Sequence, residues 1–416
     1  MTAPPASGTG PGPGIPPPTS RTPFRYVALA LGVTAFTAGV PTPLYAIYEA
    51  RYGFASGTLA EIFGAYTLGV LLTTFFVAPL SDRIGRKPVL YVGLGLTAAA
   101  GVAFLLAGGA AGLALARVVS GLAVGASTST ATASMAGLEP RGDQHHVARV
   151  SVAANFGGVA TGILVSGLLA QYGPAPTETV YLVVVAVSAL ALALVARTPE
   201  TVVVDPHRRI RVQRLVVPAA VRRPFWVAAG ALAACYSIYG LFGALAPTFL
   251  AAQIGVTNRA EGAAIVAVLF GLAAIVQLGL GEVRDRRALL DGLPLILGGL
   301  VALVLALPLG SLPLLLAGAA VMGLGIGFAY MGSVTLIDRV APDDQRGELL
   351  AAFFVVGYLA LAVPTIGLGL AADRVGLERS AVVFGAALGL FVAGLELATG
   401  RTPTPPGGGG RPRDRP

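Results

Sequence analysis

Charge, cysteine and histidine are all scarce in this sequence of 416 residues. Asp, Glu, Lys and Arg together make up 12% of the chain, whereas hydrophobic residues make up 55% and the mean hydropathy is +0.79. A soluble protein of this length has too little interior to bury so many apolar side chains. The composition therefore predicts a membrane protein with the lipid bilayer as its main partner. The single cysteine excludes an intrachain disulfide framework.

Motifs of enzymes and of metal sites are also missing. The sequence contains no Gly-x-Ser-x-Gly elbow, no Walker loop and no His-Glu-x-x-His. The adjacent His145 and His146 are poorly spaced to bind one metal ion. We therefore expect no enzymatic activity, no metal and no cofactor. The net charge of +8 does not indicate a nucleic-acid partner, because the cations lie in loops and tails beside apolar runs.

Apolar runs dominate the chain, and each is close to the length of about 20 residues that crosses a bilayer as a helix. Six lie in the first half, at 26–48, 59–80, 88–108, 112–137, 147–170 and 179–196, and six in the second, at 225–251, 261–281, 289–308, 312–336, 348–371 and 380–399. The first run is too long for a signal peptide and is predicted to be an uncleaved helix. Pro41 and Pro43 should kink the outer end of that helix, where the Thr42 hydroxyl could serve a freed carbonyl.

The segments between these runs divide the chain into five parts. Residues 1–24 are rich in Pro, Gly, Ser and Thr and are predicted to be a disordered tail, as are residues 400–416. A basic loop at 197–223 separates a first bundle, 25–196, from a second bundle, 224–399. The halves also repeat a pattern at constant offset: Gly121, Leu122, Gly125 and Pro140 match Gly323, Leu324, Gly327 and Pro342. We expect an all-α integral membrane fold of two pseudo-symmetric six-helix bundles.

An even number of spans places both chain ends on one side of the membrane, and the positive charges identify that side. Only Arg51, Arg259, Arg374 and Arg379 fall on the opposite side. Cytoplasmic loops carry the excess of Lys and Arg. Both termini and the 197–223 loop are therefore predicted to be cytoplasmic. The preference for Arg over Lys, together with abundant Ala, Gly and Pro, indicates a GC-rich bacterial source and hence the inner membrane.

The most distinctive segment is the polar stretch 78–90 between the second and third runs. So many polar residues cannot lie in hydrocarbon, so the stretch is predicted to be a tight turn at the cytoplasmic surface. It resembles the signature loop between helices two and three of the major facilitator superfamily, with Ala78 in place of the opening Gly. The residues that match the signature are Asp82, Arg83, Gly85, Arg86 and Lys87.

This resemblance implies the fold of that superfamily, with the substrate bound between the two bundles near the middle of the membrane. It also implies a conformational latch in which Asp82 meets the start of helix eleven near Gly347. In that latch Gly85 permits the turn, and Arg86 pairs with Asp82 or with Glu139. The alternative is a loop that only sets the topology through its positive charge.

Arg117 is a cation within the fourth apolar run, where a charge is costly and often functional. With Gly121 and Gly125 it resembles the R-x-x-x-G-x-x-x-G motif of the same superfamily, which implies a part in proton coupling. The alternative is that Arg117 lies near the outer end of its helix and extends its side chain to the headgroups.

Polar and aromatic residues near the middle of the membrane are candidates for a substrate cavity. The resemblance implies that helices one, four, seven and ten line it. The candidates on those helices and on helix eleven are Thr34, Thr37, Ser127, Thr128, Tyr236, Ser237, Tyr239, Tyr330 and Tyr358. Asn155 in the fifth helix either bonds a neighbouring helix or faces the cavity. Hydroxyls and aromatic rings favour a mostly apolar substrate over a strongly charged one.

These features favour a secondary transporter that exports a small, mostly apolar drug or metabolite, working as a monomer in an antiport driven by the proton gradient. An importer that takes up a sugar or organic acid with protons stays open. Two features leave room for this importer: the first helix has no central carboxylate, and the fifth helix lacks the Gly-Pro usual in antiporters of the superfamily. A membrane sensor without transport activity is the third possibility, and the intact 82–87 loop disfavours it.

Overall fold

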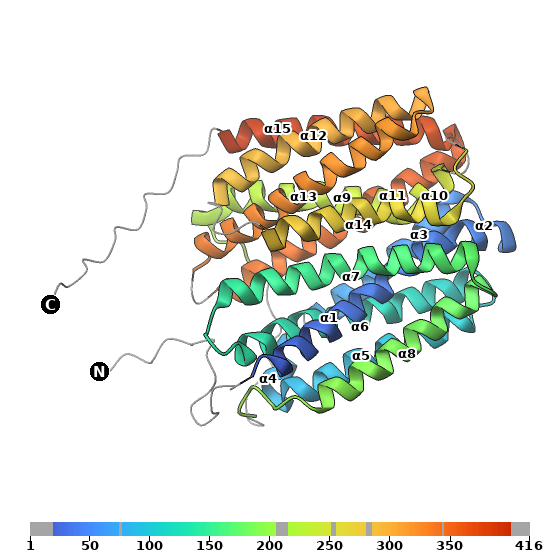
Figure 1. Ribbon diagram of the computed structural model, residues 1–416. Coiled ribbons are helices and arrows are strands. Elements are labelled where there is room, and N and C mark those ends of the chain that lie inside the picture. The colour runs from blue at the N-terminus through green and yellow to red at the C-terminus, as the bar shows by residue number, and fades with distance from the viewer. Residues whose placement is uncertain are drawn as a thin grey trace.

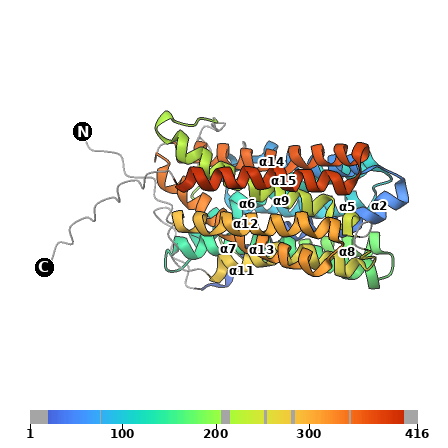
Figure 2. The ribbon, with the colours of Figure 1, turned by 90° about the horizontal axis from the view of Figure 1, so that it is seen from above.

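The computed structural model describes residues 20–74, 77–204, 215–250, 255–279, 285–342 and 345–400, apart from the side chains of residues 78, 79, 82, 248, 285, 286 and 400. Every regular element in these ranges is a helix. Figures 1 and 2 show the long helices running along one common axis. We call the end of the bundle at which α1 begins and α15 ends the terminal end, and the opposite end the far end (Figure 1).

The first half contains α1 (Thr22–Gly39), the 3-10 helix η1 (Thr42–Leu44), α2 (Tyr45–Tyr52), α3 (Ser56–Thr74), α4 (Val77–Ile84), α5 (Arg86–Leu105), α6 (Ala110–Leu138), α7 (Gln144–Tyr172) and α8 (Pro176–Ala196). The second half contains η2 (Ala219–Val221), α9 (Arg222–Ala244), α10 (Ala246–Phe249), α11 (Arg259–Gly279), α12 (Asp285–Leu309), α13 (Leu312–Val340), α14 (Arg346–Val375) and α15 (Leu377–Gly400).

Eleven stretches of the described residues are helical, long and apolar enough to cross a membrane, with α1 to α2 counted as one. The remaining expected span corresponds to α3 and α4, which flank residues 75 and 76. This arrangement confirms the predicted all-α membrane fold. Of the predicted non-helical segments, residues 1–19, 205–214 and 401–416 lie outside the described residues. The tail predicted over 1–24 is too long, because α1 already begins at Thr22 with Pro23 in its first turn, where proline is well tolerated.

The first span breaks where its two prolines lie, as expected. α1 ends at Gly39, and Pro41 and Pro43 flank or enter η1 before α2 continues to Tyr52. The carbonyls at the break find donors on other helices rather than on Thr42. Ser166 Oγ donates to the Val40 carbonyl at 2.6 Å, and Arg117 Nη1 donates to the Ala38 carbonyl at 2.9 Å. The break therefore joins α1 to α6 and α7.

The tight turn predicted for the stretch 78–90 is wrong in extent. Helix α4 continues through Asp82 and Arg83, and the change of direction occurs at Gly85 alone. One residue is enough because Gly85 has φ of 102°, a conformation that side chains with a Cβ rarely adopt. The polar residues at the end of α4 extend the helix by about one turn beyond residue 80 instead of forming a loop.

Packing within the two halves follows the repeat seen in the sequence. Gly121 of α6 lies against the backbone of α3 at Tyr66, and Gly323 of α13 lies against the backbone of α11 at Leu269. In each half a glycine thus allows the fourth span to approach the second closely. The halves meet where α7 packs on α11 and α3 packs on α14. Figure 1 shows the first half in blue to green and the second in yellow to red, on opposite sides of this contact.

Candidate functional site

A cavity lies between the two halves, in the middle of the bundle. Helices α1, α3, α6 and α7 contribute to its wall from the first half, and α9, α11 and α14 from the second. Most of the large lining side chains are aromatic: Phe63, Tyr66, Phe156, Tyr236, Tyr239, Phe270 and Tyr358. The polar lining residues other than tyrosine are Thr42, Arg117 and Asn155. The wall is therefore an aromatic surface that carries one cation and one amide.

Five of the predicted cavity and coupling residues line this cavity. They are Arg117, Asn155, Tyr236, Tyr239 and Tyr358. The sequence left open whether Asn155 bonds a neighbouring helix or faces the cavity. It lies on the cavity wall, and its side chain forms no hydrogen bond to the protein in the described structure. Its amide is therefore available to a bound molecule rather than to a neighbouring helix.

The other predicted cavity residues lie outside this lining. Three hydroxyls bond the preceding turn of their own helix: Thr34 to Ala30, Thr37 to Val33 and Thr128 to Val124. Ser127 is buried beside Gly93 of α5, and Ser237 donates across to the Ala360 carbonyl of α14 at 3.0 Å. Tyr330 is not among the lining residues, and it packs edge-on against Phe156 at 5.1 Å between ring centroids.

Sequence reasoning missed several aromatic lining residues: Phe63 and Tyr66 on α3, Phe156 on α7, and Phe270 on α11. These helices were not expected to contribute, because the resemblance assigned the lining mainly to helices one, four, seven and ten. They do contribute because α3 with α14 and α7 with α11 form the contact between the halves, so their facing side chains border the space left there. An aromatic residue in an otherwise small and apolar run was the only available signal.

Arg117 is held deep inside the protein and does not extend to the headgroups. Its side chain is 1% exposed. Nε donates to the hydroxyl oxygen of Tyr45 at 2.6 Å, and Nη1 donates to the Ala38 carbonyl at 2.9 Å. These bonds anchor the guanidinium at the break in the first span, and the alternative of a headgroup contact is wrong.

The surroundings of Arg117 are aromatic rather than acidic. Its guanidinium carbon lies 5.2 Å from the ring centre of Phe63, 5.3 Å from that of Tyr45 and 5.8 Å from that of Tyr66. Each desolvated contact of this kind contributes about 0.5–2 kcal/mol, against an insertion cost of about 2.5–3.5 kcal/mol for a central Arg. Among the described residues no carboxylate pairs with Arg117, and its Nη2 is buried without a hydrogen-bond partner.

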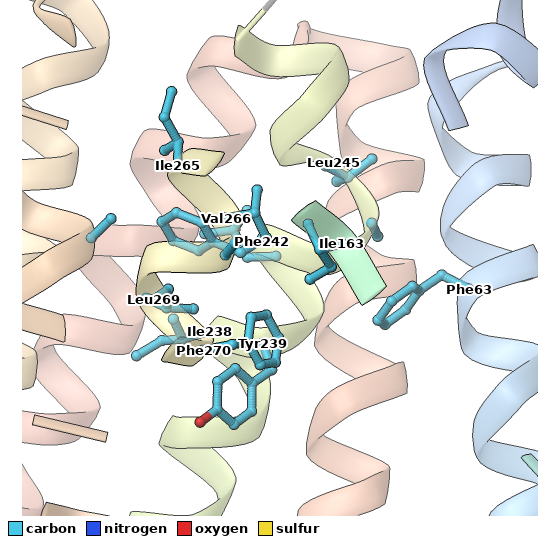
Figure 3. Close-up of a cluster of buried hydrophobic side chains, with 14 of the residues drawn as sticks. Phe63, Ile163, Ile238, Tyr239, Phe242, Leu245, Ile265, Val266, Leu269 and Phe270 are labelled. Atoms are coloured by element: carbon cyan, nitrogen blue, oxygen red, sulfur yellow. The ribbon is translucent and has the colours of Figure 1, made fainter. Parts of the chain in front are cut away.

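The second half supplies a connected group of aromatic rings. Tyr239 stacks on Phe270 at 4.4 Å between centroids, and Tyr236 meets Tyr358 edge-on at 5.3 Å. Figure 3 shows Tyr239 and Phe270 side by side, with Phe63 on the α3 side of the same region. Phe156 of α7 lies 5.4 Å from Tyr239, so rings from both halves touch at the cavity.

Beyond the cavity, the halves are joined by hydrogen bonds at the far end. Asp373 Oδ2 of α14 accepts from the backbone N–H of Gly57, in the first turn of α3, at 3.0 Å. Gln171 Oε1 at the end of α7 accepts from the backbone N–H of Arg259, at the start of α11, at 2.9 Å. The exposed N–H groups of a helix start favour such acceptors. We call these two contacts the far-end clasp.

At the terminal end, the predicted latch residues Arg86 and Lys87 bind groups of the first half. The backbone N–H groups of Arg86 and Lys87 donate to the two oxygens of Glu200 at 3.1 and 3.0 Å. Lys87 Nζ donates to the carbonyl of Ala196, the last residue of α8, at 2.8 Å and to that of Thr198 at 2.9 Å. Arg86 Nη1 donates to the Ala133 carbonyl of α6 at 2.7 Å. Glu200 was missed because it was counted within the basic interdomain loop.

The remaining latch candidates have different surroundings. Glu139 Oε2 accepts from the backbone N–H groups of Arg141 and Asp143 at 2.7 and 2.9 Å, so Glu139 stabilises the turn between α6 and α7. Its Oε1 lies 3.9 Å from Nη2 of Arg21. Arg83 is exposed, and the Asp82 side chain lies outside the described structure. A contact of Asp82 with the start of α14 therefore stays a prediction.

Comparisons with known proteins agree with this architecture. No sequence among curated proteins matches the chain. The solved structure of the human organic anion transporter MFSD10 (TETRAN) is similar with a TM-score of 0.66 at 15% sequence identity, covering 91% of this chain and 100% of that one. At that identity the likeness concerns the fold. The family model of the Major Facilitator Superfamily matches residues 27–365, most of the sequence, so the chain belongs to this superfamily, whose members are transporters rather than enzymes.

Proposed function

We propose that the protein is a secondary active transporter that exports a small, mostly apolar molecule by alternating access, with the proton gradient as its energy source. The observation that carries this proposal is the central cavity, whose wall is shared by both halves. A molecule held there contacts both halves at once. A rocking motion of one half against the other would expose it first to one side of the membrane and then to the other.

The chemistry of the wall supports an apolar substrate. Aromatic side chains provide large flat surfaces with hydroxyl groups at their edges, and they suit ligands that are mostly hydrocarbon with a few polar atoms. The described lining contains no Asp or Glu. A transported proton would therefore bind outside this lining or travel on the substrate.

A second candidate is the uptake of an organic acid together with protons. Arg117, which lines the cavity and whose buried Nη2 has no hydrogen-bond partner, favours this candidate, because an organic acid carries the opposite charge. We further propose that the protein acts as a monomer in the cytoplasmic membrane with both chain ends in the cytoplasm, which places the far-end clasp outside.

Transport can be tested in liposomes that contain the purified full chain, with a panel of neutral and singly charged aromatic dyes and an imposed pH gradient. We expect dye movement that stops when a protonophore collapses the gradient. Movement against the proton flow supports export, and movement with it supports uptake. A panel that moves no faster than in empty liposomes would refute transport and favour the sensor.

Two substitutions by tryptophan provide a matched control for the role of the cavity. Val159→Trp adds bulk to the cavity wall and should abolish movement of the dyes. Leu390→Trp adds the same bulk at a side chain that is 76% exposed on the outside of α15, and should leave movement unchanged. Equal rates in the two variants would remove the cavity from the transport path.

A further inference from the structure

We propose that Arg117 binds the negative charge of the transported molecule, so that the substrate is a small aromatic or apolar compound with a single anionic group. This inference rests on the proposed transport function and specifies its substrate class. The first observation is the use of the guanidinium donors. An Arg side chain has five N–H donors, and the protein uses Nε for Tyr45 and Nη1 for Ala38. Nη2 is buried without a protein acceptor, in a residue that lines the cavity.

The second observation is the charge balance around the cavity. Arg117 forms no ion pair with the described residues, and three aromatic rings surround its guanidinium. Rings stabilise the cation but do not neutralise it. Because Arg117 is buried, its remaining positive charge favours an anion and opposes a cation, since charges interact strongly at low dielectric. An oxyanion at Nη2 would supply the missing acceptor and the missing charge together.

The other lining residues indicate how many anionic groups the substrate carries. Arg117 is the only cationic residue among the described residues that line the cavity, so a second anionic group would be left without a partner. Tyr236, Tyr239 and Tyr358 offer ring faces and hydroxyls, and Asn155 offers an amide that is not used within the protein. These groups suit an aromatic body with one further polar atom.

The orientation of the guanidinium supports a binding role over a purely structural one. Tyr45 and Ala38 hold Nε and Nη1 from the side of the first span, which fixes the plane of the fork. A fixed fork loses little conformational freedom when it binds a planar carboxylate. Tyr45 is therefore a positioning residue that acts through Arg117.

Binding of naphthoate and of naphthamide to the purified full chain tests this proposal. The two probes share one aromatic body and differ in charge. We expect naphthoate to bind at least about ten-fold more tightly, the effect of one hydrogen bond to a charged group. Arg117→Gln should abolish that difference, because naphthoate loses the cation that binds its carboxylate. Equal affinities for the two probes in the unmodified protein, or a preference for naphthoate that survives Arg117→Gln, would overturn the proposal.

A second variant keeps the test decisive if Arg117→Gln fails to fold. Asn155→Asp leaves Arg117 and its hydrogen bonds in place and adds a negative charge to the same cavity. It should weaken naphthoate binding by about ten-fold or more relative to naphthamide binding. If both probes weaken equally, the charge is not sensed and the proposal fails.

The outcome can be separated from that of the transport proposal. Anion-selective binding without any gradient-driven movement would refute the transport function but support the role of Arg117 in binding an anion. Gradient-driven movement of neutral dyes, with no preference for naphthoate over naphthamide, would support transport and refute the role of Arg117.

Discussion

At the scale of single residues, the hydrogen bonds of Tyr45 and Tyr48 show how Arg117 is held. Two tyrosines of α2 are both buried and both form hydrogen bonds, but with different partners. The hydroxyl of Tyr45 accepts from the charged Nε of Arg117, whereas the hydroxyl of Tyr48 donates to that of Tyr181 at 3.0 Å. Hydrogen bonds to charged groups contribute more than neutral ones.

This difference predicts unequal effects of removing each hydroxyl. Tyr45→Phe should lower the free energy of unfolding by about 1.5–3 kcal/mol, and Tyr48→Phe by about 0.5–1.5 kcal/mol. Denaturant unfolding of the purified variants in detergent measures both values. An equal or larger loss for Tyr48→Phe would show that Arg117 does not depend on Tyr45.

The sequence identified Arg117 as important but not the position of its guanidinium. A cation within an apolar run is readable from the sequence, because its cost does not depend on its neighbours. The direction in which the Arg117 guanidinium points depends on the helix break at Pro41 and Pro43, which supplies the Ala38 carbonyl as an acceptor. The threonines and serines were harder to place, because a hydroxyl that bonds its own helix needs no cavity at all.

At the scale of helices, the repeated glycines set how closely the spans pack. A Cβ at Gly121 would approach the Tyr66 carbonyl of α3 more closely than real Cβ atoms do, and backbone would have to move. Gly95 lies within α5, and a Cβ on this residue would extend into open space.

Alanine substitutions at these two glycines should therefore have opposite effects. Gly121→Ala should lower the midpoint of thermal unfolding, with a cost of about 1–3 kcal/mol from overpacking. Gly95→Ala should be neutral or raise stability by up to about 1 kcal/mol, since alanine favours a helix more than glycine does. Thermal unfolding of the two variants under the same conditions checks the contrast. Similar losses for both would mean that close packing of α6 on α3 is unimportant.

The far-end clasp gives a prediction for the motion of α14 against α3. Asp373→Asn removes the charge at the start of α3, an interaction worth a few tenths to about 1 kcal/mol. The far end should then open about two- to five-fold more often. The readout is the rate at which an impermeant maleimide labels Asn155→Cys in cells of a Cys235→Ala background.

Glu378 provides the control for this experiment. It is an acid at the same end, in the first turn of α15, and its side chain forms no hydrogen bond in the described structure. Glu378→Gln should leave the labelling rate unchanged. If Asp373→Asn also leaves the rate unchanged, the hydrogen bond to Gly57 does not hold the far end closed.

At the scale of the whole molecule, the fold was predicted more fully than the site. The length of an apolar run is decided one span at a time by the thickness of the bilayer, so the number and order of helices can be read directly. The cavity wall depends on which faces meet when the halves pack, as for Phe156 and Tyr239. These spans are apolar on nearly every side, so their pattern does not show which face is inward.

Topology provides a prediction for the entire chain. Tyr172 at the far end is 71% exposed, and Val203 beyond α8 at the terminal end is 58% exposed. In a Cys235→Ala background, an impermeant maleimide added to intact cells should label Tyr172→Cys but not Val203→Cys. Permeabilising the membrane should allow the maleimide to label Val203→Cys. The reverse pattern would place both chain ends outside the cell and overturn the proposed orientation.

The contacts of Glu200 have a consequence for how the chain can be divided. Its carboxylate accepts from the backbone N–H groups at the start of α5, and Lys87 Nζ donates to the carbonyls of Ala196 and Thr198. The segment that follows α8 is therefore bound to the first half. Two separately translated polypeptides, 1–204 and 215–416, should therefore associate in the membrane and be recovered together through an affinity tag on either one. Glu200→Ala should reduce the yield of this co-purification, because the first polypeptide would lose the contact that secures its newly created end.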